Sequence, residues 1–120
     1  MRPNLSASRW AGMFLIAFTC SVAAVTSAGS FQCTDSTRVQ LAAVRPVVSA
    51  SAAPVMLIAQ KLRCQGFDSK VPGQLVATCR FQSGEDVGCS LVSQGVARED
   101  ANKQQRYDLP TCGERAEARR

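Results

Sequence analysis

The chain has 120 residues, a formal net charge of +5 and no histidine. This length allows one small domain with a modest core. The lack of histidine removes the usual base for a serine or cysteine nucleophile, and the sequence contains no phosphate-loop or dinucleotide-binding motif. The positive charge is mild and is not interleaved with aromatic residues as in typical nucleic-acid binders. Composition therefore favours a binding or structural domain over an enzyme.

The N-terminal segment has the pattern of an export signal. Arg2 and Arg9 precede an uncharged apolar run at residues 10–25, and small residues continue to Gly29. This order is typical of a cleavable secretory signal peptide. We predict that residues 1–28 are removed and that the protein is periplasmic or secreted. A membrane anchor is the alternative, but it needs about 20 apolar residues, so stable membrane insertion is not expected.

Cysteine usage agrees with an oxidising compartment, where disulfides are the default state. Five of the six cysteines would remain after the predicted cleavage, because Cys20 leaves with the signal. An odd count leaves one thiol free or bridged to another chain. The partners of Cys33, Cys89 and Cys112 stay open. The chain has no Cys-x-x-Cys pair, so no metal site is expected.

The first predicted strand covers residues 37–44, where aliphatic and β-branched residues partly alternate with Arg38 and Gln40. Residues 47–59 are rich in alanine and serine and contain Pro54. Because proline disrupts a helix interior but suits its first turn, any helix here is short or begins at Pro54.

Two further strands are predicted at residues 61–64 and 75–81, separated by a loop with glycine and proline. Alternation places Cys64 and Cys79 on the apolar faces of these strands. If the strands are antiparallel neighbours, the two cysteines are the best candidates for a disulfide. Two buried free thiols are the alternative.

Basic residues accompany the same two strands and the loop between them. Lys61, Arg63, Lys70 and Arg80 are the candidate binding residues, and the ligand would be a polysaccharide or a nucleic acid. The alternative is an ordinary solvated basic face.

A short amphipathic helix is predicted between Ser83 and Gly95. Ser83 would cap its start with Asp86 answering as in a capping box, and Gly95 would end it in a left-handed conformation. The polar tail, residues 112–120, is expected to be solvated unless Cys112 joins a disulfide.

Residues 57–97 resemble the second half of the thermonuclease, or staphylococcal-nuclease-like, domain. The family places a strand, an aspartate-bearing loop, a strand ending in L-A-x-C and a helix in this order. Residues 37–46 resemble an upstream family segment more weakly. The matching positions are Asp68, Gly73, Leu75, Val76, Ala77, Thr78, Cys79, Asp86, Val87, Gly88, Leu91, Val92, Gly95 and Ala97.

The resemblance implies a fold class that is mainly β with some α. Residues 29–111 would form a small, truncated OB-type barrel with one or two short helices. Residues 112–120 would form a polar tail.

The same resemblance implies that the family's chemistry is lost. These nucleases use a bound calcium ion, a glutamate and two arginines. Here Gln74 and Gln40 occupy the arginine positions, and Arg45 stands where a metal-binding aspartate belongs. Neutral amides cannot supply the charge of guanidinium groups, and a positive side chain repels calcium. No catalytic residue and no cofactor is therefore expected.

The sequence thus predicts an exported, non-catalytic, degenerate thermonuclease-like module that binds a ligand or serves as an accessory factor. The chain also resembles exported thermonuclease-like proteins of this size that are associated with exopolysaccharide (succinoglycan) biosynthesis. The specific expectation is therefore an accessory role in that biosynthesis. A secreted calcium-dependent nuclease with a re-formed site and a purely structural disulfide-bonded module are the alternatives.

Overall fold

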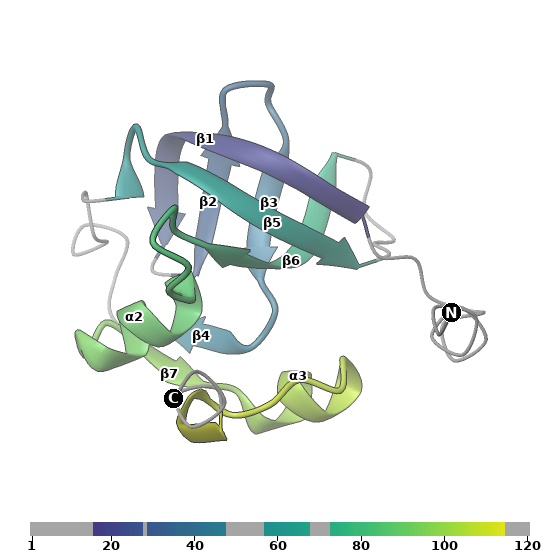
Figure 1. Ribbon diagram of the computed structural model, residues 1–120, viewed down its shortest axis with the longest axis vertical. Helices are drawn as coiled ribbons and strands as arrows, with labels where there is room; N and C mark the ends of the chain where they lie inside the picture. The colour runs from purple at the N-terminus through teal and green to yellow at the C-terminus, as the bar shows by residue number, and fades with distance from the viewer. Residues whose placement is uncertain (1–15, 28, 48–56, 68–72, 115–120) are drawn as a thin grey trace.

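A closed five-stranded barrel dominates the computed structural model, which describes residues 16–27, 29–47, 57–67 and 73–114 (Figure 1). The strands follow one another around the barrel in the order β1-β2-β3-β6-β5. Only β3 and β6 pair in parallel, and the other neighbours are antiparallel. The barrel strands are β1 (Ile16–Ser27), β2 (Ser30–Cys33), β3 (Arg38–Leu41), β5 (Lys61–Phe67) and β6 (Gln74–Arg80). The protein therefore has the expected fold class, mainly β with short helices and a barrel compatible with a small OB-type barrel.

A small cap of helices and strands lies at one end of the barrel (Figure 1). It contains a two-stranded ribbon, β4 (Val44–Pro46) with β7 (Ala97–Glu99), and the helices α2 (Val87–Ser93) and α3 (Ala101–Arg106). Val87 and Leu91 of α2 are fully buried and belong to the same hydrophobic cluster as the barrel interior. The cap and the barrel thus share one core.

Strand β1 gives the N-terminal segment a role that differs from the expected export signal. It pairs with both β2 and β5, so it closes the barrel. Its side chains Cys20 and Val22 are buried. A run of small, uncharged and β-branched residues suits a half-buried strand as well as the apolar region of a signal. Cleavage after residue 28 would remove β1, and this cleavage remains a prediction.

All six cysteines of the full chain are paired. The bridges are Cys20–Cys33, Cys64–Cys79 and Cys89–Cys112. The expected odd count arose because Cys20 was assigned to the removed signal. With Cys20 in β1 the count in the full chain is even, whereas cleavage after residue 28 would leave Cys33 without its partner.

The two central strands pair as the alternation of their residues predicts. In β5 and β6, Cys64 lies directly opposite Cys79, and the two are bridged with a Cα–Cα distance of 4.0 Å. Both cysteines are buried, at 6% and 1% exposure. Strand β5 continues to Phe67, three residues past the predicted end.

Removing the Cys64–Cys79 bridge is expected to lower the free energy of unfolding by about 3 kcal/mol, because the bridge restricts the unfolded chain over a loop of this length. The two cysteines are 15 residues apart in sequence. Urea unfolding of the Cys64→Ala/Cys79→Ala variant measures the loss. Non-reducing peptide mapping of the variant must still find the other two bridges. A loss below about 1 kcal/mol would show that the bridge constrains the chain far less than loop closure requires.

The upstream strand differs in detail from its prediction. The predicted strand over 37–44 is divided into β3 and β4, and β4 continues through Arg45 to Pro46, where it pairs with β7. Proline is tolerated there because β4 is an edge strand of a two-stranded ribbon. The helix expected to begin at Pro54 lies outside the described residues.

Helix α2 begins later than predicted, and its capping residue is Asp86 rather than Ser83. The Asp86 side chain accepts a hydrogen bond from the Cys89 backbone N–H at 2.8 Å. Ser83 instead accepts from the Glu85 backbone N–H in the preceding turn. The predicted helix end is confirmed, since Gly95 has a φ of +80°.

The C-terminal tail is tied to the barrel as far as residue 114. Helix α3, which was not predicted, is capped by Asp100. Tyr107 then packs against Phe67 of β5 with ring centroids 4.7 Å apart. The Cys89–Cys112 bridge fastens the segment that follows. In the described part of the chain, no helix is both long enough and apolar enough to cross a membrane.

Candidate anion-binding site

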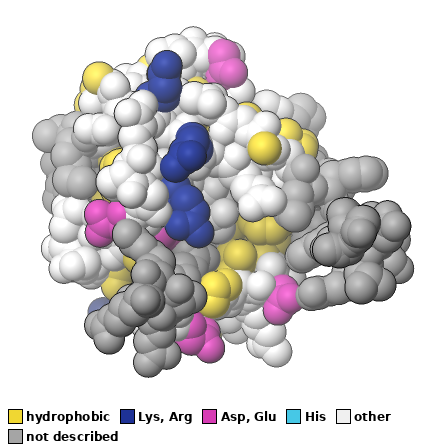
Figure 2. Space-filling model, in the orientation of Figure 1, with side chains coloured by type: hydrophobic (Ala, Val, Ile, Leu, Met, Phe, Trp, Pro, Cys, Tyr) yellow, Lys and Arg dark blue, Asp and Glu magenta, His cyan; other side chains and the backbone are white. Residues whose placement is uncertain are grey.

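Three of the four predicted binding residues lie together on the outside of the barrel. Lys61 and Arg63 alternate outward along β5, and Arg80 of β6 lies directly opposite Arg63. All three are exposed. Figure 2 shows lysine and arginine side chains in a row on this face, and we call Lys61, Arg63 and Arg80 the basic stripe. The fourth residue, Lys70, lies outside the described residues.

The register of β5 and β6 places two like charges in direct opposition. Directly opposed like charges destabilise an antiparallel pair. Arg80 also donates from Nη1 to the Gly84 carbonyl oxygen at 2.9 Å, which fixes its side chain near the turn before α2. That neutral carbonyl cannot cancel the guanidinium charge. An anion bound between Arg63 and Arg80 would relieve their repulsion.

The basic stripe leads into a cleft of about 810 Å³. This volume falls in the range of ordinary ligand sites, roughly 300–1,000 Å³. Outward residues of β5 and β6 form the floor, and these include Arg63, Gln65, Thr78 and Arg80. The walls are the start of α2 and the tail segment held by the Cys89–Cys112 bridge.

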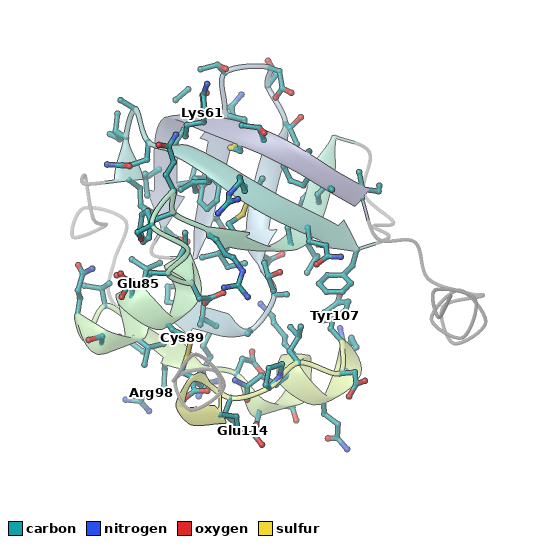
Figure 3. The ribbon with its side chains drawn as sticks, in the orientation of Figure 1. Lys61, Glu85, Cys89, Arg98, Tyr107 and Glu114 are labelled. Carbon is teal, nitrogen blue, oxygen red and sulfur yellow. A yellow bond between two sulfur atoms is a disulfide. The ribbon has the colours of Figure 1, made fainter. Side chains whose placement is uncertain are left out.

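The walls bring carboxylates to the cleft. Glu85 and Asp86 lie just before α2, and Glu114 lies in the tail. Figure 3 labels Glu85 and Glu114. Two of these carboxylates are held by backbone donors. Asp86 accepts from Cys89, and Glu114 accepts from the Thr111 N–H at 2.8 Å while Thr111 Oγ accepts from the Glu114 N–H at 3.1 Å. The cleft therefore combines a basic floor with acidic, hydrogen-bond-accepting walls.

The positions that the thermonuclease resemblance assigns to two arginines do meet in the structure. Gln74 of β6 donates from Nε2 to Gln40 Oε1 of β3 at 3.3 Å. Arg38, at the start of β3, is the direct cross-strand partner of Gln74. Arg45, at the expected metal-ligand position, is exposed on β4 opposite Arg98 of β7.

The segment before β3 contains a turn. Asp35 Oδ1 accepts from the Thr37 N–H at 3.0 Å. This backbone hydrogen bond, followed by one from the Thr37 side chain, lowers the pKa of the exposed Asp35 carboxyl. Within the described residues, no group of three or more histidine, cysteine, aspartate or glutamate side chains could hold a metal ion. Asp68 lies outside these residues.

Comparison of the chain with protein-family models, with characterised proteins and with solved structures finds no match. The thermonuclease resemblance is therefore carried by the quoted residues alone.

Of the predicted binding residues that the structure describes, Arg63 and Arg80 lie on the floor of the cleft, and none lies in its walls. Glu85 and Glu114 were not among the predicted site residues. Two signals could have identified the tail wall. Thr111 and Glu114 have the spacing of a capping box, and an even cysteine count would have required a partner for Cys112.

Proposed function

We propose that this protein is an exported, non-catalytic module that binds an acidic polysaccharide and serves as an accessory factor in exopolysaccharide biosynthesis, of the succinoglycan type. The observation that carries the proposal is the Arg63–Arg80 pair at the floor of a cleft whose walls carry carboxylates. Guanidinium groups bind carboxylates through paired, charge-assisted hydrogen bonds.

The acidic walls favour a sugar acid over a nucleic acid. Sugar hydroxyls can donate hydrogen bonds to Glu85 and Glu114, whereas the phosphates of a nucleic-acid backbone have no proton to donate at neutral pH. Single-stranded nucleic acids also bind on aromatic side chains that stack with the bases. The outward residues of β5 and β6 on the cleft floor are Arg63, Gln65, Thr78 and Arg80, none of which is aromatic.

The covalent structure supports export. Three disulfides in a chain of this size are consistent with an oxidising compartment, because cytosolic thiols are kept reduced. We propose that the protein works in the periplasm or outside the cell.

Affinity electrophoresis of the full chain tests the proposal. We expect alginate, a polyuronate, to retard the protein strongly in the gel. Neutral dextran tests the need for charge, and single-stranded DNA tests the need for sugar hydroxyls. Retardation by DNA but not by alginate would overturn the proposal, as would equal retardation by dextran.

The protein is also expected to have no calcium-dependent nuclease activity. Loss of one preorganised donor at an anionic transition state costs about a hundredfold to a thousandfold in rate, and both Gln40 and Gln74 replace arginines of the resembling family. Incubation with single-stranded DNA and calcium is the measurement. The neighbouring Arg38 is the residue from which a re-formed site could draw. Calcium-dependent cleavage that survives purification and disappears in Arg38→Ala would establish a nuclease instead.

A further inference from the structure

A second group of polar side chains lies on a different part of the barrel. Gln32 of β2, Arg38 of β3 and Gln74 of β6 are consecutive cross-strand partners, so they form one row across three strands. Gln40 lies two residues beyond Arg38 on the same outward side of β3. We call these four residues the amide cluster. Gln74 and Arg80 are the two ends of β6, so the cluster is roughly 20 Å along the strand from Arg80, at about 3.3 Å per residue.

The hydrogen bond between Gln40 and Gln74 fixes what the cluster can offer to a ligand. Gln74 Nε2 donates to Gln40 Oε1, so the Gln40 amide keeps its N–H donors and the Gln74 amide keeps its carbonyl oxygen as an acceptor. Both side chains are half-buried, which limits their motion. Arg38 adds an exposed guanidinium beside them.

We propose that the amide cluster binds one uronic acid unit. The sugar carboxylate would accept paired hydrogen bonds from Arg38. Neighbouring sugar hydroxyls would accept from the Gln40 amide and donate to the Gln74 carbonyl oxygen. A single positive charge among neutral amides matches a ligand with one charge and several hydroxyls. The inference rests on the proposed function for the source of this unit, an acidic polysaccharide, and adds a contact separate from the basic stripe.

An NMR titration of the ¹⁵N-labelled full chain with D-glucuronic acid tests this site. We expect saturable shifts of the Arg38, Gln40 and Gln74 amide signals, and none with D-glucose at equal concentration. The Gln40→Ala/Gln74→Ala variant should bind glucuronic acid about tenfold more weakly, because two hydrogen bonds are lost. Gln105→Ala, an exposed change on α3, is the matched control. Arg38→Gln should remove the binding while it keeps a hydrogen-bonding side chain.

Shifts that avoid β3 and β6, or equal affinity of the glutamine variant and the control, would overturn the inference. Replacement of Arg63 and Arg80 by glutamine separates this result from the proposed function. That variant should lose retardation by alginate and keep the glucuronic acid titration at Arg38. Alginate retardation of the wild-type chain without shifts at Arg38 would reject the amide cluster alone. Shifts at Arg38 without any alginate retardation would support the cluster and reject the proposed function.

Discussion

Deletion of residues 1–28 is expected to prevent the barrel from folding. The deletion removes β1, which lies between β2 and β5, so both neighbours lose a hydrogen-bonded partner. It also removes the buried Val22 side chain, worth about 1.5–3 kcal/mol. The Cys20–Cys33 bridge, worth about 3 kcal/mol for a loop of this size, is lost as well. Together these losses are comparable with the net stability of a small domain, about 5–15 kcal/mol.

Circular dichroism with thermal melting measures this effect. A deletion of residues 1–14 is the matched control, because β1 begins at Ile16 and stays intact. We expect a cooperative melt for the control and none for the fragment that starts at Gly29. If that fragment melts cooperatively at the temperature of the control, β1 is dispensable and the predicted signal cleavage is compatible with the fold.

The N-terminus of the exported protein shows whether the mature chain keeps β1. If the mature protein forms this barrel, it keeps Cys20 in a bridge with Cys33. Intact mass and N-terminal sequencing of protein recovered from the periplasm or medium give the answer. A mature N-terminus at Gly29 would confirm the sequence prediction and would leave Cys33 as the odd thiol.

Replacement of Arg63 and Arg80 by glutamine is expected to weaken alginate binding about a hundredfold or more. Each arginine is expected to contribute charge-assisted hydrogen bonds, worth about 1.5–3 kcal/mol, and about 1.4 kcal/mol corresponds to a tenfold change in affinity. The fold should be retained, because both side chains are exposed and the removal of their mutual repulsion offsets the loss of the Arg80–Gly84 hydrogen bond. Isothermal titration calorimetry of the double variant measures the loss.

The chain supplies a closely matched control for this experiment. Arg45 and Arg98 form a second pair of exposed arginines directly opposed across two strands, on the β4–β7 ribbon. Arg45→Gln/Arg98→Gln makes the same change in net charge away from the cleft. We expect this variant to retain most of its affinity. Equal losses in the two double variants would mean that alginate responds to net charge alone.

The alternation of residues in the central strands was sufficient to predict their pairing. Leu62 and Cys64 share the inward face of β5, and Ala77 and Cys79 share the inward face of β6. Because the inward face of each strand is buried, the register between the strands is fixed. Gly95 also predicted the end of α2 correctly. The position has a positive φ, which a residue without a side chain adopts easily.

The missed features each had a pattern with two physical meanings. An uncharged run of small and β-branched residues can be the apolar part of a signal or a barrel strand. The structure pairs this run with β2 and β5 and bridges Cys20 to Cys33, and its cleavage as a signal stays a prediction. Ser83 and Asp86 are both good capping residues. An isolated antiparallel β-bridge pairs the backbone of Asp86 with that of Arg80, so Asp86 is still extended and the helix begins at Val87.

The candidate site was only half predictable for a similar reason. The alternation along β5 placed Lys61 and Arg63 on one outward face. The opposition of Arg63 to Arg80 follows from the predicted register of Cys64 and Cys79, whereas the acidic walls depend on a tail folded back by the Cys89–Cys112 bridge. Such long-range contacts leave little local pattern in the sequence.

The central claim is that acidic sugar units bind along the basic stripe, and covalent coupling tests it most directly. Alginate oligosaccharides with pre-activated carboxylates form an amide bond with a lysine amine that lies against them. The chain has three lysines, of which Lys61 belongs to the stripe and Lys103 lies on α3, with its Nζ 3.5 Å from the Val44 carbonyl oxygen. Peptide mapping should find the sugar predominantly on Lys61, and excess free alginate should suppress the coupling. Labelling of Lys103 to the same extent as Lys61, unaffected by free alginate, would contradict the account.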